Sequence, residues 1–199
     1  MSDPQPLNVL LVIGSPREKS VTRTAMHHLA ARLRDAGCAV DVLDLRENTL
    51  PPYNPDTSYA HPEFGAFKAR LVRAEAIVLG SPDYHGCVSS TLKNFLDHFW
   101  QEFTGKLIGH VVASHEKGLT VIDQLRTMAR QCYAWTMPYA VAVQEKVDVT
   151  DGAVTSDSAR QRLEMFARDL RVYGTLLARQ RAADLAGTEP GFLARARKK

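Results

Sequence analysis

Two apolar runs of this chain end in the same triplet, Gly-Ser-Pro, and polar residues follow each of them. The first segment, "GSPREKSVT" at 14–22, contains Ser15, Arg17, Ser20 and Thr22. Hydroxyl groups and an arginine beside the free N–H groups of a helix start suit a phosphate monoester dianion. The simpler interpretation is that Ser20 or Thr22 only caps the helix. Three hydroxyls close to Arg17 favour the phosphate.

The second triplet opens the segment "GSPDYHG" at 80–86. Pro82 stiffens the turn, and Gly86 lets a ligand approach the main chain closely. Tyr84 and His85 offer flat amphipathic faces. This combination predicts a wall for a planar heterocycle. The alternative is an aromatic turn that packs only against its own domain.

Several other binding and catalytic motifs are excluded because the required residues do not occur at the required spacing. A nucleoside-triphosphate loop aligned on Lys19 would place Ile13 and Glu18 where glycines are required, and no GxGxxG segment occurs. A Cys-x5-Arg phosphatase loop starting at Cys87 would place a lysine at the arginine position, so we expect Cys87 to be a small buried or half-buried residue. "HEKGL" has Leu119 where HExxH needs its second histidine, and no GxSxG elbow occurs. We therefore assign no metal ligands.

Composition places the chain among ordinary globular proteins. It has 199 residues, 45% hydrophobic and 24% charged, which is enough for one sizeable α/β domain over 1–199. A net charge of +3 does not by itself predict a nucleic-acid partner. Part of that charge lies in 190–199, which we expect to be a flexible basic tail.

No targeting or membrane signal is evident. The apolar runs are far shorter than the ~20 residues that span a bilayer, and the N-terminus lacks the pattern of a secretory signal. Three scattered cysteines suit a reducing compartment, so a cytoplasmic location is expected. The proline-rich segment 47–63 reads as a long functional loop.

The elements that position these segments alternate along the chain. Apolar runs predict strands, and helical spacing of apolar residues predicts the helices between them. The strands are expected at 7–13, 39–45, 76–80, 107–114 and 139–144, and the helices at 21–36, 63–73, 89–101, 119–135 and 157–180. This alternation predicts a five-stranded parallel sheet with helices on both faces. In a 2-1-3-4-5 order, both Gly-Ser-Pro segments would meet at the carboxyl edge, where such sheets bind ligands.

The paired segments "GSPREKSVT" and "SPDYHGCVSSTLKNFLDH" resemble the NAD(P)H-dependent FMN reductases of the flavodoxin-like superfamily. Those proteins carry G-S-x-R-x-x-S-x-T/N after strand 1 and P-x-Y-N/H-G, followed by L-K-N-x-L/I-D, after strand 3. The resemblance covers the order of elements through most of the chain and implies a flavodoxin-like three-layer fold.

The resemblance also implies which residues contact FMN. The phosphate would be held by Ser15, Arg17, Ser20 and Thr22, and the ribityl chain and ring by the second loop. The third loop, "ASHEKGLT" at 113–120, lacks the Gly-Gly pair frequent in the family. The second- and third-loop residues so implied are Pro82, Asp83, Tyr84, His85, Gly86, Ser114, His115, Lys117 and Gly118.

The activity implied is transfer of hydride from NADPH or NADH through FMN to a small acceptor such as a quinone, an azo compound or free flavin. FMN carries the chemistry, so no catalytic side chain is assigned. Family members are commonly homodimers or homotetramers, and neither nucleic acid nor a membrane is expected as a partner. A flavin-binding electron carrier or redox sensor is the alternative, although the basic pI of 8.8 argues mildly against a carrier. A phospho-ligand hydrolase is a third, weaker hypothesis.

Overall fold

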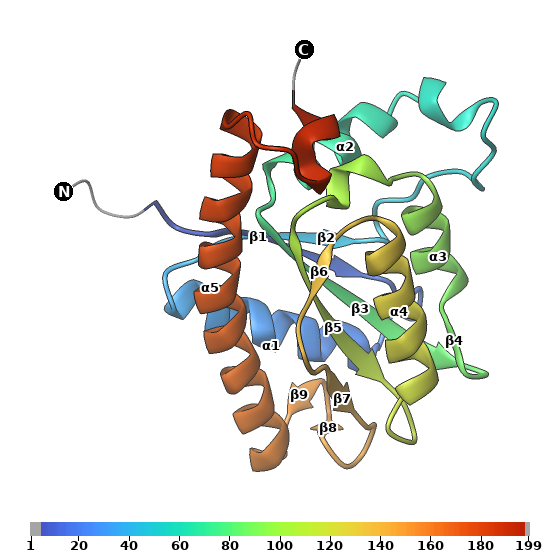
Figure 1. Ribbon diagram of the computed structural model, residues 1–199. Coiled ribbons are helices and arrows are strands. Elements are labelled where there is room, and N and C mark those ends of the chain that lie inside the picture. The colour runs from blue at the N-terminus through green and yellow to red at the C-terminus, as the bar shows by residue number, and fades with distance from the viewer. Residues whose placement is uncertain (1–4, 198–199) are drawn as a thin grey trace.

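The computed structural model describes residues 5–197, in which a mainly parallel sheet lies between two layers of helices (Figure 1). The strands of the sheet are β1 (Asn8–Ile13), β2 (Ala39–Asp44), β3 (Ala76–Tyr84), β4 (Cys87–Val88), β5 (Leu107–Ala113), β6 (Trp135–Thr136) and β7 (Val141–Val143), and β8 (Val149–Thr150) and β9 (Ala153–Val154) form a separate hairpin. The α-helices are α1 (Val21–Asp35), α2 (Phe64–Arg73), α3 (Ser90–Asp97), α4 (Leu119–Gln131) and α5 (Asp157–Ala186), and the 3-10 helices are η1 (Ser58–Ala60), η2 (Gln101–Phe103) and η3 (Phe192–Ala196).

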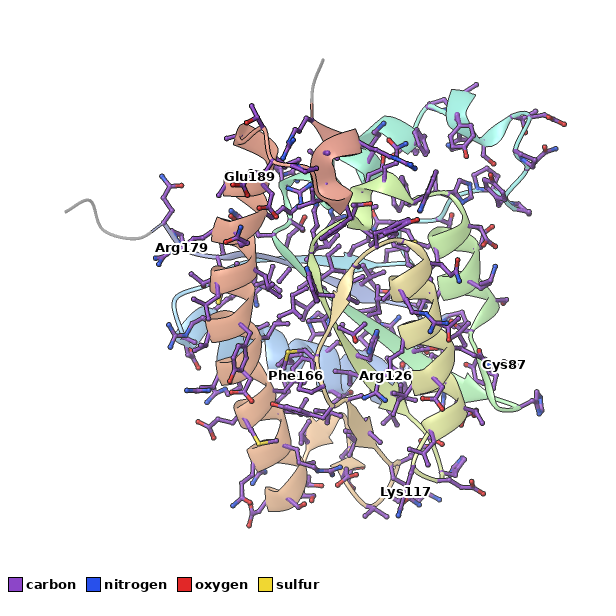
Figure 2. The ribbon with its side chains drawn as sticks, in the orientation of Figure 1. Cys87, Lys117, Arg126, Phe166, Arg179 and Glu189 are labelled. Atoms are coloured by element: carbon purple, nitrogen blue, oxygen red, sulfur yellow. The ribbon has the colours of Figure 1, made fainter. Side chains whose placement is uncertain are left out.

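The central strands are apolar on both faces because both faces are covered. Side chains of α1 and α5 pack with one face, and those of α2, α3 and α4 pack with the other. The α5 layer approaches the sheet closely at Gly109, where an added Cβ would lie 2.3 Å from the ring of Phe166. Figure 2 shows Phe166 on α5 beside the sheet. The near-continuous apolar runs in the sequence therefore predicted correctly that helices cover both faces of the sheet.

The predicted spatial order of the strands is confirmed. The order is β2-β1-β3-β5-β6, and β7 also pairs with β5, so β6 and β7 together occupy the fifth position. The strand expected at 139–144 is shortened to β7, and β6 lies before it; Pro138, between β6 and β7, has no N–H for the ladder. Two small additions were not predicted: β4, antiparallel to β3, and the β8–β9 hairpin.

Three helix ends differ from expectation by more than one residue. The helix expected at 119–135 ends at Gln131, since the chain turns at Tyr133, whose φ is 55°. The helix expected at 89–101 ends at Asp97 and is followed by η2. The last helix continues beyond 180 to Ala186. Helical periodicity therefore located these helices better than it located their ends.

The flexible tail expected at 190–199 is wrong for residues 192–196, which form η3. Leu193 is only 2% exposed, and its side chain packs against Gly105. Arg197 also donates from Nε to the main-chain oxygen of Asp184 at 2.8 Å. One buried leucine and one arginine hydrogen bond attach this segment to the rest of the protein, although its basic composition predicted a solvated tail. Residues 198–199 lie outside the described residues.

The proline-rich segment 47–63 is anchored to α3 by a single amide. Asn94 Oδ1 accepts from the Tyr53 N–H at 2.8 Å, and its Nδ2 donates to the main-chain oxygens of Leu50 and Pro51 at 3.1 and 3.0 Å. Asn94 thus holds the start of this loop to the helix. A functional role for the segment stays a prediction.

Candidate functional site

The loop between β1 and α1 begins the site. Ser20 is the N-cap of α1, and its hydroxyl accepts from the Arg23 N–H at 3.2 Å, so Ser20 does cap the helix. Ser15 is buried. The Thr22 hydroxyl is also buried, and no residue in the described part of the chain pairs with it. An unpaired buried hydroxyl costs about 1–3 kcal/mol, so Thr22 marks a place where a polar ligand fits.

The same loop also contains free main-chain donors. Within residues 5–197, no acceptor faces the main-chain N–H groups of residues 17–22 at the helix start. Arg17 adds a guanidinium, which pairs with Glu145 at 3.3 and 3.4 Å. These two side chains are 56% and 37% exposed, so the pair is weak and can exchange partners. An anion entering here would meet unused N–H groups and a displaceable arginine.

Two acidic partners of this loop were missed by sequence reasoning. Glu145 follows β7 at the same carboxyl edge as the loop. A negatively charged carboxylate is unexpected beside a site predicted to bind an anion. Asp44 ends β2 and binds Arg23, with Nε–Oδ2 at 2.5 Å and Nη2–Oδ1 at 3.1 Å. Asp44 ends one strand and Glu145 follows another, both predicted to end at this edge, which is the signal that could have identified them.

The Arg23–Asp44 pair is ionised. Burial disfavours the Asp44 carboxylate, but hydrogen bonds from Arg23 and from the Arg46 N–H outweigh burial and lower the pKa of Asp44. The hydrogen bond with Asp44 in turn raises the pKa of Arg23 above its usual value. The positive charge behind the first loop is thus held in place by a carboxylate that stays charged at neutral pH.

The second loop is a tight hairpin turn at the end of β3. His85 and Gly86 have φ values of 58° and 76°, the two positive angles that a two-residue turn between paired Tyr84 and Cys87 requires. The Gly86 N–H donates to Asp83 Oδ1 at 2.8 Å. Tyr84 is 42% exposed, so the aromatic turn does not pack into its own domain. Cys87 is exposed as well, contrary to the expected burial, because β4 projects beyond the sheet.

The third loop is tied to the second. Ser114 Oγ donates to Asp83 Oδ2 at 3.0 Å, so one carboxylate organises both loops. Gly118 begins α4 at φ 62°, where an added Cβ would lie 2.7 Å from a valine methyl of β5. Figure 2 shows Lys117 at the outer end of the loop between β5 and α4. Gly118 therefore shapes the start of the helix.

The three loops enclose one groove of about 110 Å³ at the carboxyl edge. Its lining brings together the segments that follow β1, β5 and β7 and the carboxyl ends of β3 and β5, as expected for the switch point of an open sheet. The lining residues are Ser15, Arg17, Ser20, Val21, Thr22, Pro82, Asp83, Tyr84, Ala113, Ser114, His115 and Glu145. The predicted residues that do not line it are His85, Gly86, Lys117 and Gly118.

Larger cavities lie elsewhere. One of about 420 Å³ is formed between the 48–52 segment and α3, and one of about 730 Å³ lies between α3 and α4. Neither gathers the loops that follow β1, β3 and β5, so size does not identify the site here. Across residues 5–197, no cluster of three or more His, Cys, Asp or Glu side chains has a metal-binding arrangement. No helix of the described chain has the length and apolarity that crossing a bilayer requires.

A family model described as NADPH-dependent FMN reductase matches residues 7–148, a range that contains all three loops. The chain belongs to this family. This match confirms the family that the two loop motifs indicated. It also confirms the expectation that the protein is an FMN-dependent oxidoreductase that uses NADPH.

Curated relatives agree with this assignment. The FMN-dependent NADPH-azoreductase of Staphylococcus haemolyticus is 25% identical over 173 residues, which cover 79% of this chain and 89% of the relative. The NADPH azoreductase of Bacillus sp. is 26% identical over 171 residues, covering 84% and 92%. The NADPH-dependent FMN reductase ArsH of Shigella flexneri is 26% identical over 158 residues, covering 76% and 61%.

Solved structures support the fold. FerB, a flavoenzyme NAD(P)H:acceptor oxidoreductase from Paracoccus denitrificans, superposes with a TM-score of 0.70 at 20% identity and covers 87% of this chain and 98% of its own. A WrbA-like flavodoxin from Agrobacterium tumefaciens gives a TM-score of 0.61 at 18% identity, covering 87% and 98%. At these identities the likeness shows the fold alone, and that fold is flavodoxin-like.

Proposed function

We propose that the groove holds FMN as the bound cofactor of an NADPH-dependent reductase whose acceptor is a small planar molecule, such as an azo compound or a quinone. One observation carries this proposal: three loops from neighbouring strands converge on one groove that contains a buried, unpartnered hydroxyl at a helix start. A pocket with unused donors on one side and aromatic faces on the other suits a ligand with a phosphate end and a ring end.

The residues fit the phosphate end. Ser15, Ser20 and Thr22 supply hydroxyls, and the free N–H groups at the start of α1 supply main-chain donors. The Thr22 hydroxyl gains the partner that it lacks in the protein alone. Arg17 moves from Glu145 to the phosphate and forms a charge-assisted bond. These groups bind and orient the cofactor, and none of them transfers a proton.

The residues also fit the ring end. When bound, FMN would supply the hydride and electron chemistry between NADPH and the acceptor. Pro82 and Asp83 would form one wall of the ribityl and ring region, and Ser114, which donates to Asp83, and His115 would border the same groove. Gly86 stays a prediction as a place of close approach to the ring. Tyr84 and His85 are exposed at the rim, where they would shield an acceptor from water. Lys117 stays a prediction as a flavin-edge contact.

The relatives narrow the acceptor class. Two of them are named azoreductases, and these cover most of the present chain. An electron carrier without its own NADPH oxidation is the alternative, and the net charge of +3 disfavours it because such carriers dock basic partners through acidic surfaces. Assembly into a homodimer or homotetramer and residence in the cytoplasm belong to the same proposal.

Reconstitution tests the proposal directly. We expect the purified protein to bind FMN and turn yellow, and anaerobic NADPH to bleach it within one mixing experiment. A quinone or an azo dye added afterwards should restore the colour at a rate that depends on its concentration. Protein that takes up no FMN contradicts the proposal, and FMN that NADPH leaves oxidised favours the carrier.

A further inference from the structure

Arg23 lies on the first turn of α1, behind the loop that precedes this helix. Its side chain is only 16% exposed and is not part of the groove lining. The family motif that led to the site specifies the arginine in the loop, Arg17, and gives no role to Arg23. Its contacts nevertheless make it the most fully engaged side chain near the candidate phosphate site.

Every N–H of the Arg23 guanidinium has an acceptor. A guanidinium carries five donors, one on Nε and two on each terminal nitrogen. Nη1 donates to the main-chain oxygens of Arg17 and Glu18, at 2.5 and 2.8 Å. Nη2 donates to the oxygen of Ser15 at 3.0 Å and to Asp44 Oδ1 at 3.1 Å, and Nε donates to Asp44 Oδ2 at 2.5 Å. No donor is left for an anion, so Arg23 is not itself a phosphate ligand.

These bonds decide which way the loop's peptide groups face. Because a trans peptide is planar, its N–H points opposite to its carbonyl oxygen. The oxygens of Arg17 and Glu18 point toward Arg23, so the N–H groups of Glu18 and Lys19 point away from it. The loop thereby presents donors on the side away from the guanidinium. It does so before any ligand binds.

We propose that Arg23, fixed by Asp44, is a positioning residue that preorganises the 15–20 loop for a phosphate monoester. The inference rests on the proposed function and deepens it, because it names the group that turns the N–H donors toward the FMN phosphate. Because these N–H donors are already oriented, less conformational entropy is lost when the ligand binds, and the affinity for the ligand is higher.

The chain contains a matched control on the same strand. Arg70 of α2 binds Asp41 of β2 through Nε at 2.9 Å and Nη2 at 2.5 Å, and it also donates to the main-chain oxygen of Val42 at 2.7 Å. This pair repeats the arginine–aspartate–carbonyl arrangement of Arg23 but touches none of the three site loops. Its loss should lower stability without changing cofactor affinity.

Binding of FMN and of riboflavin, measured by quenching of flavin fluorescence, separates positioning from general support. The variants are Arg23→Lys, Asp44→Asn and Arg70→Lys. We expect Arg23→Lys and Asp44→Asn to raise the FMN dissociation constant about tenfold. Riboflavin affinity should stay within about twofold of wild type, because riboflavin has no phosphate. Arg70→Lys should leave both affinities within the same twofold limit.

Each other outcome has a distinct meaning. If Arg23→Lys weakens FMN and riboflavin equally, or weakens neither, the positioning role is overturned while the proposed function stands. A wild-type protein that binds riboflavin as tightly as FMN likewise overturns the positioning role, since the loop would then give the phosphate no advantage. Wild-type protein that binds no flavin overturns the proposed function. Urea unfolding of each variant without flavin reports any loss of stability separately.

Discussion

Two cations, the half-buried Arg23 and the buried Lys106, meet main-chain carbonyls at opposite ends of the sheet. Arg23, at the carboxyl edge, binds the oxygens of a loop and turns its N–H groups outward. Lys106 precedes β5 at the amino edge and is 2% exposed. Its ammonium donates to the oxygens of Leu71 and Val72, in the last turn of α2. Both cations donate hydrogen bonds to main-chain carbonyl oxygens.

The consequences of the two contacts differ. The carbonyls at a helix end have no partners within the helix, and Lys106 supplies a donor to two of them at the end of α2. The oxygens bound by Arg23 belong to a loop whose N–H groups have no acceptor in the described structure, so that contact leaves donors available. The same kind of contact thus completes the end of a helix at the amino edge and leaves free N–H donors for a ligand at the carboxyl edge. Stability should be the sensitive property at Lys106, and ligand affinity at the first loop.

The largest expected effect is on stability at the amino edge. Lys106→Ala removes a buried stem and leaves the Leu71 oxygen unpaired, which should lower the free energy of unfolding by about 3 kcal/mol. Urea unfolding measures this loss. The control is Lys68→Ala, since Lys68 is half exposed and pairs only with Glu102, and its cost should stay below about 0.5 kcal/mol. A large loss of FMN affinity in Lys106→Ala would break the comparison.

The pH dependence of stability should also report Lys106. Burial, together with nearby Arg181, lowers the pKa of Lys106 from 10.5 to about 7. Between those values the unfolded chain binds a proton that the folded chain does not, so the free energy of unfolding rises with pH. From pH 7 to 9, wild type should gain at most about 2 kcal/mol relative to Lys106→Met. The bonds to Leu71 and Val72 favour the ammonium and reduce this gain.

Urea unfolding of the two proteins at both pH values gives that difference. A difference that is constant with pH would mean that Lys106 stays charged in the folded protein. A difference that falls as pH rises would mean that the fold favours the ammonium, and the carbonyl bonds would then outweigh burial.

At the carboxyl edge, Thr22→Val should separate affinity from stability. Valine keeps the shape of threonine and removes a buried hydroxyl that has no partner in the described structure. The flavin-free variant should therefore be as stable as wild type or up to about 1 kcal/mol more stable. FMN affinity should fall about tenfold, or 1.4 kcal/mol, as measured by fluorescence quenching. Thr22→Ser keeps the hydroxyl and should retain most of the affinity. Unchanged affinity in Thr22→Val would remove this hydroxyl from the phosphate site.

The smallest effect is expected at the Arg17–Glu145 pair. Glu145→Gln removes a carboxylate that competes with an anion for Arg17, so FMN should bind a few-fold more tightly, on the order of 0.5 kcal/mol. The gain should shrink as salt is added, because the groups are exposed. Asp97→Asn disrupts a comparable exposed pair on α3 and serves as the control. Weaker FMN binding in Glu145→Gln would assign Glu145 a direct contact with the ligand.

Much of this architecture could be predicted from local pattern. Uninterrupted apolar runs indicated strands buried on both faces, and polar residues after two of them indicated one edge. Nine of the thirteen predicted contact residues line the groove. These residues lie at or close to the carboxyl ends of β1, β3 and β5, and the sequence pattern located those ends approximately. Their role toward FMN stays a prediction.

The remaining features depend on partners far apart in the chain. Arg23 reads as an ordinary helical residue until β2 brings Asp44 beside it, 21 positions later. Glu145 reaches Arg17 across 128 positions. The burial of Leu193 could not be predicted from the basic tail, because it depends on packing against Gly105. Such pairings arise from the packing of elements, and no local propensity encodes them.

The divided fifth strand also bears on how copies of the protein meet. An uninterrupted edge strand would offer its free N–H and C=O groups to any other strand, a common start of aggregation. Here β6 and β7 are short and separated by a residue that cannot donate, and the opposite edge strand, β2, carries Asp41 in an ion pair with Arg70. Both borders of the sheet are therefore poor templates for strand addition. The protein should tolerate high concentration without fibril growth, and contacts between copies should form through helices and loops.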